Sequence, residues 1–334
     1  WNNGKGFEPI GNLSNKFTGS FNGQNYKIKN LYINRGNEDN IGLFGAVEST
    51  NEIKSVGLEN SYIIGKNYVG SLIGSLIRGI IDEIYSKDIA VQGYGNEIGG
   101  LIGKNENGTI KNTFTTGTVA GNIYVGGLTG FNNGTIENSY STSDLNGRIF
   151  LGGLVGYNYK NGTIKNSFST GKAPGFVNYN KGSITNSYGY NYTKCAYNNY
   201  GSSDCIIKNN KSYFYSKNNQ PMTDWDFVNI WKETTNNFII LKNLCKSKVC
   251  SELGKECGSW NDGCEKMIDC GACSSGNCIS GKCIQKCSDS DGGNNIYVKG
   301  TTTGYDTNGN LITREDSCSS RLNRVIEYYC STTG

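Results

Sequence analysis

The sequence predicts an all-β protein, a parallel β-helix followed by small disulfide-rich modules, on the strength of three observations. Leucines recur at positions 43, 72, 101, 128 and 154, at intervals of 29, 29, 27 and 26 residues. Apolar residues alternate over short runs bounded by Gly and Asn, and the 3.6-residue period of helices is missing. All 13 cysteines lie between Cys195 and Cys330.

Each repeat contains a glycine pair, an Asn-Gly-Thr turn and an Ile-x-Asn trio. The segment GGLIGKNENGTIKNTFTTG begins at Gly99 and returns with small changes from Gly126 and from Gly152. A fixed period of this length is typical of solenoids, in which each repeat packs only on its neighbours. The sequence therefore predicts stacked coils made of strands and turns.

Stacked coils place equivalent residues above one another, at the ~4.8 Å spacing of hydrogen-bonded strands. We therefore expect Ile110, Ile136 and Ile164 to be neighbours. Glycines supply the positive φ values that corners need, and asparagine amides can satisfy the corner backbone by forming a ladder. The asparagines predicted to form this ladder stand at positions 112, 138, 166 and 186.

The composition argues against an enzyme and against a nucleic-acid-binding protein. The chain has no His, which excludes Ser-His-Asp and Cys-His catalysis and His-ligated metals. The net charge of +4 is scattered over the sequence, which does not suit nucleic acid. β-Helix enzymes that act on polysaccharides need paired carboxylates, or carboxylates with Ca²⁺. The repeats do not supply a recurring pair, so we nominate no catalytic residue among Glu97, Glu106, Glu137 and Asp144.

The repeats resemble the GLUG repeat of prokaryotic cell-surface proteins, whose consensus is GGLVG-x-N-x-G-x-I-x-NSYSTG. GFEPIGN…FTGSFNGQNYKIKNLYINR resembles the first coils of such proteins, and MTDWDFVNIWKETTNNFIIL at 222–241 resembles their closing segment. The resemblance covers residues 1–243 and implies a right-handed parallel β-helix and a surface location. Such proteins usually have about one more coil before the counterpart of Trp1. We therefore expect the first coil to present an open strand edge that favours end-to-end pairing of subunits.

Residues 188–217 interrupt the repeat and are predicted to form a decorated late coil, with a loop closed by Cys195 and Cys205. A phenol ring has an apolar face and a polar tip, so this loop is a candidate sugar-stacking platform. Packing between strands is the alternative interpretation of its tyrosines. The ligand candidates are Tyr190, Tyr192, Tyr197 and Tyr200.

Three domains are expected: a β-helix with its cap over 1–243, a cysteine-rich disulfide module over 244–286, and a small β-rich module over 287–334. The apolar residues from Trp225 to Trp231 have helix-like spacing, which predicts a short amphipathic turn across the last coil. Such a turn would cap the core and protect the terminal strand edge.

The cysteine-rich module has few apolar residues, so disulfides must replace burial there. Cys270 and Cys273 form a C-x-x-C that also suits a zinc ribbon, but no clean second pair follows, and disulfides are favoured. An odd number of cysteines leaves one over, and we expect Cys330 to pair beyond Gly334. The predicted disulfide cysteines are Cys195, Cys205, Cys245, Cys250, Cys257, Cys264, Cys270, Cys273, Cys278, Cys283, Cys287 and Cys318.

The last module, with its DSDGG and later DSC, resembles a C-terminal module of archaeal surface proteins. Asp289 and Asp291 alternate as oxygen donors before a glycine pair, and such a loop can wrap Ca²⁺. Asp306 or Asp316 can add charge to this calcium site. An Asp-Gly turn without metal is the alternative.

The cysteine density indicates an oxidising compartment, and no apolar run approaches the ~20 residues that span a bilayer. We expect an extracellular surface glycoprotein that serves as a rigid rod for adhesion, an envelope layer or a self-associating filament. A carbohydrate-binding adhesin that recognises surface glycans is the alternative, and a polysaccharide-active enzyme is less favoured. The candidate N-glycosylation sites are Asn12, Asn107, Asn133, Asn161, Asn191 and Asn210.

Overall fold

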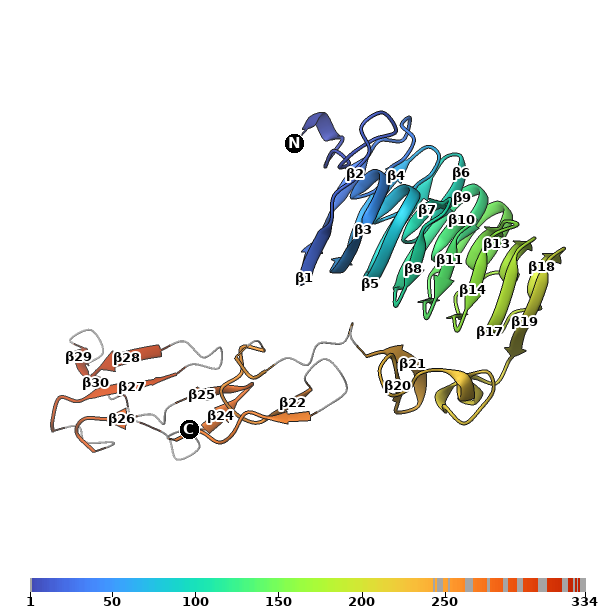
Figure 1. Cartoon of the computed structure of the whole chain (residues 1–334). Coiled ribbons are helices and arrows are strands. Elements are labelled where there is room, and N and C mark those ends of the chain that lie inside the picture. Colours follow the sequence, from blue (N-terminus) through green and yellow to red (C-terminus); the bar gives the residue numbers. More distant parts are fainter. Residues whose placement is uncertain are drawn as a thin grey trace. The chain divides into compact units, whose positions relative to one another are not determined.

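The computed structural model (Figure 1) confirms the all-β class. Its contacts divide the chain into two compact units, Trp1–Leu244 and Cys245–Gly334. The structure describes residues 2–242, 244, 249–251, 253–261, 267–274, 277–284, 288–292, 297–305, 311–319, 324–326, 328 and 330.

The first unit is a parallel β-solenoid, with the strands of successive coils side by side along its axis (Figure 1). The 3-10 turn η1 spans Asn2–Gly4. The strands are β1 (Phe21–Lys29), β2 (Tyr32–Asn34), β3 (Phe44–Glu59), β4 (Tyr62–Gly65), β5 (Ile73–Gly93), β6 (Asn96–Gly99), β7 (Ile102–Asn105), β8 (Thr109–Lys111), β9 (Phe114–Gly126), β10 (Thr129–Asn132), β11 (Thr135–Glu137), β12 (Tyr140–Ser141), β13 (Asp144–Asn158), β14 (Thr163–Lys165), β15 (Phe168–Ser169), β16 (Gly175–Asn180), β17 (Ser183–Tyr190), β18 (Lys194–Asn199) and β19 (Ser202–Lys208).

Equivalent residues of successive coils pair in parallel register, as the repeat predicts. Ile136 lies between Ile110 and Ile164, its partners on the coils before and after it. The same column extends to Ile81 and to Ile184. Each of these side chains is at most 1% exposed, so the column forms a continuous core of the solenoid.

The amide ladder lies in a different column from the predicted one. In the inner column, the Nδ2 of each asparagine donates to the Oδ1 of the next at 2.8–2.9 Å, through Asn105, Asn132, Asn158, Asn180 and Asn199. Their amides also brace the following turns, since Asn105 accepts from the Gly108 N–H and donates to the Gly108 carbonyl. The first four of these asparagines are fully buried, where an unpaired amide would be costly, and Asn199 on the last coil is exposed.

The predicted ladder residues are corner residues instead. Asn112, Asn138, Asn166 and Asn186 have φ values of 52°, 48°, 48° and 45°. Asparagine tolerates this left-handed conformation better than most residues, which explains its recurrence there. The predicted ladder is wrong as a continuous chain: Asn112 donates to Asp82, and Asn166 donates to Asn138 at 3.3 Å.

The first coil does not present a fully open edge. Residues 5–7 run antiparallel to β2: the Phe7 N–H donates to the Tyr32 carbonyl at 2.8 Å, and the Asn34 N–H donates to the Lys5 carbonyl at 2.9 Å. The expectation of an open edge is therefore corrected, because the chain's own start pairs with part of it.

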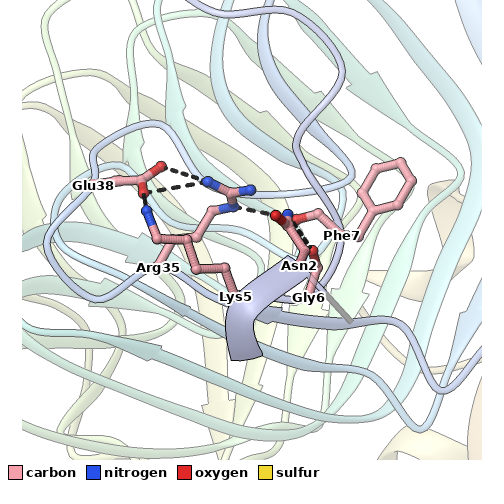
Figure 2. A network of polar contacts seen from close by, with 6 residues as sticks. All are labelled: Asn2, Lys5, Gly6, Phe7, Arg35 and Glu38. Carbon is pink, nitrogen blue, oxygen red and sulfur yellow. Dashed lines mark hydrogen bonds and ion pairs between the residues drawn. The ribbon is translucent and has the colours of Figure 1, made fainter.

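Ion pairs hold this starting segment in place (Figure 2). Glu38 pairs with Lys5 at 2.9 Å and with Arg35 at 3.0 Å. Arg35 Nε also donates to the Phe7 carbonyl at 3.3 Å, so one guanidinium joins the acid to the edge segment. The pKa of Glu38 is lowered, because hydrogen bonds from Lys5 and Arg35 outweigh its partial burial.

The last coil is formed by the tyrosine-rich segment. β18 pairs with β16 and β19 pairs with β17, all in parallel, and Val177 lies opposite Ala196. The disulfide Cys195–Cys205 joins the two strands of this coil across 10 residues. The segment is therefore a regular coil in register with the solenoid, stapled by a disulfide.

Residues 211–244 return along the side of the solenoid. They include the 3-10 turns η2 (Lys211–Tyr215) and η3 (Met222–Asp224) and an antiparallel hairpin of β20 (Trp231–Thr234) and β21 (Asn237–Leu241). They cover stacked rings at spacings of 4.6–4.9 Å, which we call the covered column: Phe114, Tyr140, Phe168 and Tyr188.

The short amphipathic turn predicted between Trp225 and Trp231 is present, because residues 227–230 form a turn in which the Ile230 N–H donates to the Asp226 carbonyl at 3.1 Å. Trp231 begins a strand, and Asp226 accepts hydrogen bonds from the Val228 and Asn229 N–H groups, which fixes a tight turn between the tryptophans. Trp231 and Trp225 pack against Phe168 of the covered column, and not across the end of the last coil.

The second unit consists of short antiparallel pairs and disulfides. Its strands are β22 (Ser259–Asn261), β23 (Met267–Asp269), β24 (Asn277–Ile279), β25 (Lys282–Ile284), β26 (Ser288–Asp289), β27 (Thr301–Tyr305), β28 (Leu311–Glu315), β29 (Ser317–Ser319) and β30 (Arg324–Ile326). Its described disulfides are Cys250–Cys270, Cys257–Cys278 and Cys273–Cys283.

Candidate functional site: an aromatic face on the solenoid

A surface of half-buried side chains runs along the solenoid in two neighbouring columns. The first column consists of corner residues in the left-handed conformation, with φ values between 55° and 62°: Tyr68, Glu97, Tyr124 and Phe150. The second column points outward from successive parallel strands: Lys104 on β7, Phe131 on β10, Tyr157 on β13 and Tyr179 on β16.

The third glycine of each GGLxG segment brings the two columns together. A Cβ on Gly130 would lie 2.4 Å from the Ile98 nitrogen and 2.5 Å from the Glu97 carbonyl carbon. A Cβ on Gly156 would lie 2.6 Å from the carbonyl carbon of Tyr124. Only glycine allows this approach, so each corner residue lies beside the outward residue of the next coil.

The rings in these columns contact one another across coils. Tyr124 stacks on Phe150 at 5.1 Å and also contacts Tyr157 at 5.1 Å, while Tyr157 contacts Tyr179 at 4.9 Å. Tyr159, at the next corner, lies 5.7 Å from Phe131 and 5.5 Å from Tyr157. We call this surface the aromatic face, and define it as Tyr124, Phe131, Phe150, Tyr157, Tyr159 and Tyr179.

Charged residues mark one end of the aromatic face. Lys104 Nζ lies 2.8 Å from Glu106, 5.4 Å from the Tyr68 ring centroid and 5.8 Å from that of Phe131. Burial raises the pKa of Glu97 to about 7, against the opposing charge of Lys104 and with help from that of Glu106. Glu97 Oε2 is buried and has no hydrogen-bond partner among the described residues.

Burial by itself would lower the pKa of Lys104. The hydrogen bond to Glu106 and the charges of Glu106 and Glu97 outweigh burial, so the pKa of Lys104 is raised and the amine stays protonated. The sequence alone does not bring Glu97, Lys104 and Glu106 together, because they occupy three different coil positions.

The opposite end of the aromatic face carries Lys181 and Tyr200. Lys181 Nζ lies 5.6 Å from the Tyr179 ring centroid, and Tyr200 contacts Tyr179 at 5.3 Å. Tyr200 is 70% exposed, so the rings become more accessible toward the last coil. The charges of Tyr157 and Tyr179 are the leading causes that raise the pKa of Lys181.

The four predicted ligand tyrosines do not form one platform. Tyr192 is buried against the core, and Tyr190 packs on Phe238 of the returning hairpin. Tyr197 is exposed beside Lys194, and Tyr200 alone continues the aromatic face. Their side chains separate because they lie on different elements: Tyr190 ends β17, Tyr197 lies on β18, and Tyr192 and Tyr200 follow these strands.

Three of the sequons form a column of their own beside the aromatic face. Thr109, Thr135 and Thr163 are register partners, which places Asn107, Asn133 and Asn161 on successive coils. The Asn161 N–H donates to Asn133 Oδ1 at 3.2 Å. The other three sequon asparagines, Asn12, Asn191 and Asn210, are exposed, and glycosylation stays a prediction at every site.

The candidate calcium ligands lie in the second unit. Asp316 is buried and accepts hydrogen bonds from the Gly300 N–H at 2.7 Å and the Tyr328 N–H at 2.9 Å, so its carboxylate is already satisfied. The Asp291 carboxylate lies beside Gly300, and Asp289 stands on β26. Asp306 lies outside the described residues. Calcium binding therefore stays a prediction.

The disulfide pairing of the described cysteines argues against the zinc-ribbon alternative. The Sγ atoms of Cys257, Cys273 and Cys278 lie within 4.8 Å of one another, but each is in a disulfide. Cys270 and Cys273 bond to different partners, so their C-x-x-C does not present two thiolates to a metal. The side chains of Cys245, Cys264, Cys287 and Cys318 lie outside the described residues.

Cys330 differs from what the sequence led us to expect. It is disulfide-bonded, which corrects the expectation that it pairs beyond Gly334.

The family of the repeat follows from comparison with known proteins. The GLUG motif matches residues 121–146 and 151–173, which contain the Gly126 and Gly152 pairs and much of the aromatic face. These coils are GLUG repeats. This confirms the resemblance noted in the sequence.

The chain spans only a small part of the length of the curated relatives that it matches. It is 36% identical over 133 residues to halomucin of Haloquadratum walsbyi, covering 39% of this chain and 1% of that protein. It is 32% identical over 136 residues to a "Putative Gly-rich membrane protein" of Evansella cellulosilytica, covering 30% of this chain and 15% of that protein. Among the described residues, no helix has the length and apolar character to cross a membrane.

A solved structure shares the fold. A Bacteroides ovatus crystal structure, described as "a putative immunoglobulin A1 protease", matches with a TM-score of 0.51 and 20% identity. The match covers 67% of this chain and 77% of that chain. At this identity the similarity concerns the fold alone, because one fold hosts many functions.

Proposed function

We propose that this protein is a non-catalytic, extracellular surface protein whose GLUG solenoid is a rigid spacer. The observation that carries the proposal is the isoleucine core column, in which Ile81, Ile110, Ile136, Ile164 and Ile184 are register partners on successive coils. In-register coils with a packed core and an internal amide ladder resist bending, because any kink breaks several ladders at once. The disulfides support an oxidising exterior.

The edges of the solenoid support a single rod over an end-to-end filament. Residues 5–7 already occupy part of the first edge. β1 has a register shift between Asn22 and Tyr26 and carries Lys27 and Lys29. Bulges and lysines are typical devices that prevent strand edges from pairing with another chain.

The charges near Glu97 support a non-catalytic role. Glycosidases need one carboxylic acid and one free carboxylate on opposite sides of the bond to be cleaved. Here Glu106 is held by an ion pair to Lys104, and the same lysine faces Glu97. A raised pKa would suit Glu97 as a proton donor, but Glu106, the carboxylate whose charge acts on it, is neutralised by Lys104 and is not a free second carboxylate.

Two measurements test the proposal. Antibodies raised against the solenoid should label intact cells of the source organism, and brief external protease treatment should remove the signal. In the purified chain, backbone amides of β7 to β17 should exchange hydrogen slowly and as one cooperative group. Labelling that requires permeabilised cells, or rapid exchange within the coils, would contradict it.

A further inference from the structure

We propose that the aromatic face binds a neutral polysaccharide, with its sugar units lying along the solenoid axis. This inference concerns a binding surface and does not depend on the spacer role. It rests on the arrangement of the rings, on the charges at their borders, and on the contrast with the other ring column of the same solenoid.

The ring arrangement suits a chain of pyranoses. A pyranose has an apolar face of C–H groups, which packs on an aromatic ring, and hydroxyls at its rim. Successive coils repeat at about 4.8 Å, close to the length of one sugar unit in an extended chain. Tyr124, Tyr157 and Tyr179 contact one another across coils, so they offer apolar surface to adjacent sugars.

The charges favour an uncharged ligand. Lys104 and Lys181 border the aromatic face, and Glu97 and Glu106 lie beside Lys104. Nucleic acids and acidic polysaccharides need a surplus of positive charge, and here Glu106 neutralises Lys104 in an ion pair, which leaves Lys181 alone at the opposite end. The same groups can hydrogen-bond sugar hydroxyls: the lysines donate, and Glu97 Oε2 is a polar atom without a partner among the described residues.

The covered column provides a comparison, because its rings pack inside the protein and are not available to a ligand. The covered column is buried by Trp225, Trp231 and Phe238 of the returning segment. In contrast, among the described residues the rings of the aromatic face contact one another, Lys104, Lys181 and Tyr200. Rings left half-exposed over successive coils mark a surface that a ligand can cover.

The experiment is affinity electrophoresis of the full chain, produced without glycosylation so that its own glycans cannot occupy the face. The gels contain a soluble β-1,4-glucan, an α-1,6-glucan or a galactomannan as neutral probes. Polygalacturonate and single-stranded DNA serve as charged probes. We expect at least one neutral polysaccharide to retard the chain, and Tyr157→Ala to weaken that binding about tenfold or more.

Control variants separate stacking from misfolding. Tyr157→Phe keeps the ring and should bind like the parent. Tyr62→Ala removes a 43% exposed tyrosine that stacks on Tyr32 outside the aromatic face, and should also bind like the parent. Circular dichroism verifies that each variant is folded.

The proposal is overturned if no neutral polysaccharide retards the chain, or if only charged probes do. It is also overturned if folded Tyr157→Ala and Tyr62→Ala bind alike. Release of reducing ends from the bound polysaccharide, abolished by Glu97→Gln, would leave the binding site in place but contradict the non-catalytic role.

Discussion

Asn132 Nδ2 donates a hydrogen bond of 2.8 Å to Asn158 Oδ1, which belongs to the residue 26 positions later and to the next coil. Asn132 Oδ1 accepts an equivalent bond from Asn105 on the coil before. The Asn132 amide also donates to the Gly134 carbonyl at 3.1 Å. One buried side chain thus joins three coils and a turn. We therefore expect the stability of the solenoid to depend strongly on this residue.

We expect Asn132→Ala to destabilise the solenoid by about 3 kcal/mol or more, because it leaves buried partners unsatisfied on both sides. Denaturant unfolding followed by the far-UV strand signal measures the change. Asn107→Ala, at an exposed position, should change the free energy of unfolding by less than about 0.5 kcal/mol. Equal effects of the two variants would contradict the role of the ladder.

Gly130→Ala should be strongly destabilising although it adds a single methyl group. The new Cβ would lie 2.4 Å from the Ile98 nitrogen, and backbone cannot move aside as a flexible side chain can. We expect a loss of about 3 kcal/mol, at the upper end of overpacking effects, and a matching fall in the thermal midpoint. Gly19→Ala is the control, because its Cβ would meet the Phe17 ring at 3.3 Å and should cost much less.

Glu97 should make the stability of the solenoid depend on pH. Its pKa is about 7 in the folded chain and 4.5 in the unfolded reference, so the folded state holds its proton to higher pH. Both states are protonated below pH 4.5, and no penalty exists there. The folded state loses stability as the pH rises from about 4.5 to 7, by on the order of 3 kcal/mol.

Glu97→Gln should remove this dependence, because glutamine does not ionise. The variant should be more stable than the parent at pH 8 and similar to it at pH 4, as measured by denaturant unfolding at both values. Glu137→Gln, outside the aromatic face, is the control. A parent chain whose stability is flat between pH 4.5 and 8 would show that folding does not raise the pKa of Glu97.

Trp231→Ala should detach the returning segment from the covered column. Trp231 is fully buried, and loss of such a side chain costs about 3–5 kcal/mol. We expect limited proteolysis to cut first between residues 211 and 242, while the coils stay intact. Val228→Ala, at an 80% exposed position of the same segment, should leave the cleavage pattern unchanged.

The isoleucine core was predictable because the repeat interval and the alternation of apolar residues both point to the same positions. The repeat interval sets which residues stack, and the period-2 alternation sets which face inward. The choice between asparagine columns was not predictable in the same way. Asn105 and Asn112 both recur with the repeat, and only the left-handed backbone at Asn112 distinguishes a corner residue from an inward one.

The aromatic face was missed for a geometric reason. Its outward column reads Lys104, Phe131, Tyr157 and Tyr179, which varies too much to signal a motif. Its rings meet across coils, Tyr124 with Tyr157, and this offset depends on the backbone contact at Gly156. A search for aromatic residues directly after the GGLxG glycine would have found Phe131 and Tyr157.

The returning segment shows how far a local pattern can be used. The spacing of Trp225, Phe227, Ile230 and Trp231 fits a short helical turn, and the chain does turn there, with the Asp226 carboxylate accepting from the Val228 and Asn229 N–H groups. The two tryptophans meet at 4.7 Å beside the covered column, and a strand begins at Trp231. The surface on which the turn packs is set by tertiary contacts, which the local spacing does not reveal.

Each column receives one residue from every coil, and this has a consequence for how such proteins can change in length. Duplication of one repeat unit would add a rung to the amide ladder, a layer to the isoleucine core and a ring to the outer surface together. No existing contact except those at the insertion point would need to re-form. The length of the solenoid and the number of rings on its outer surface would therefore increase together, in proportion to the number of repeats.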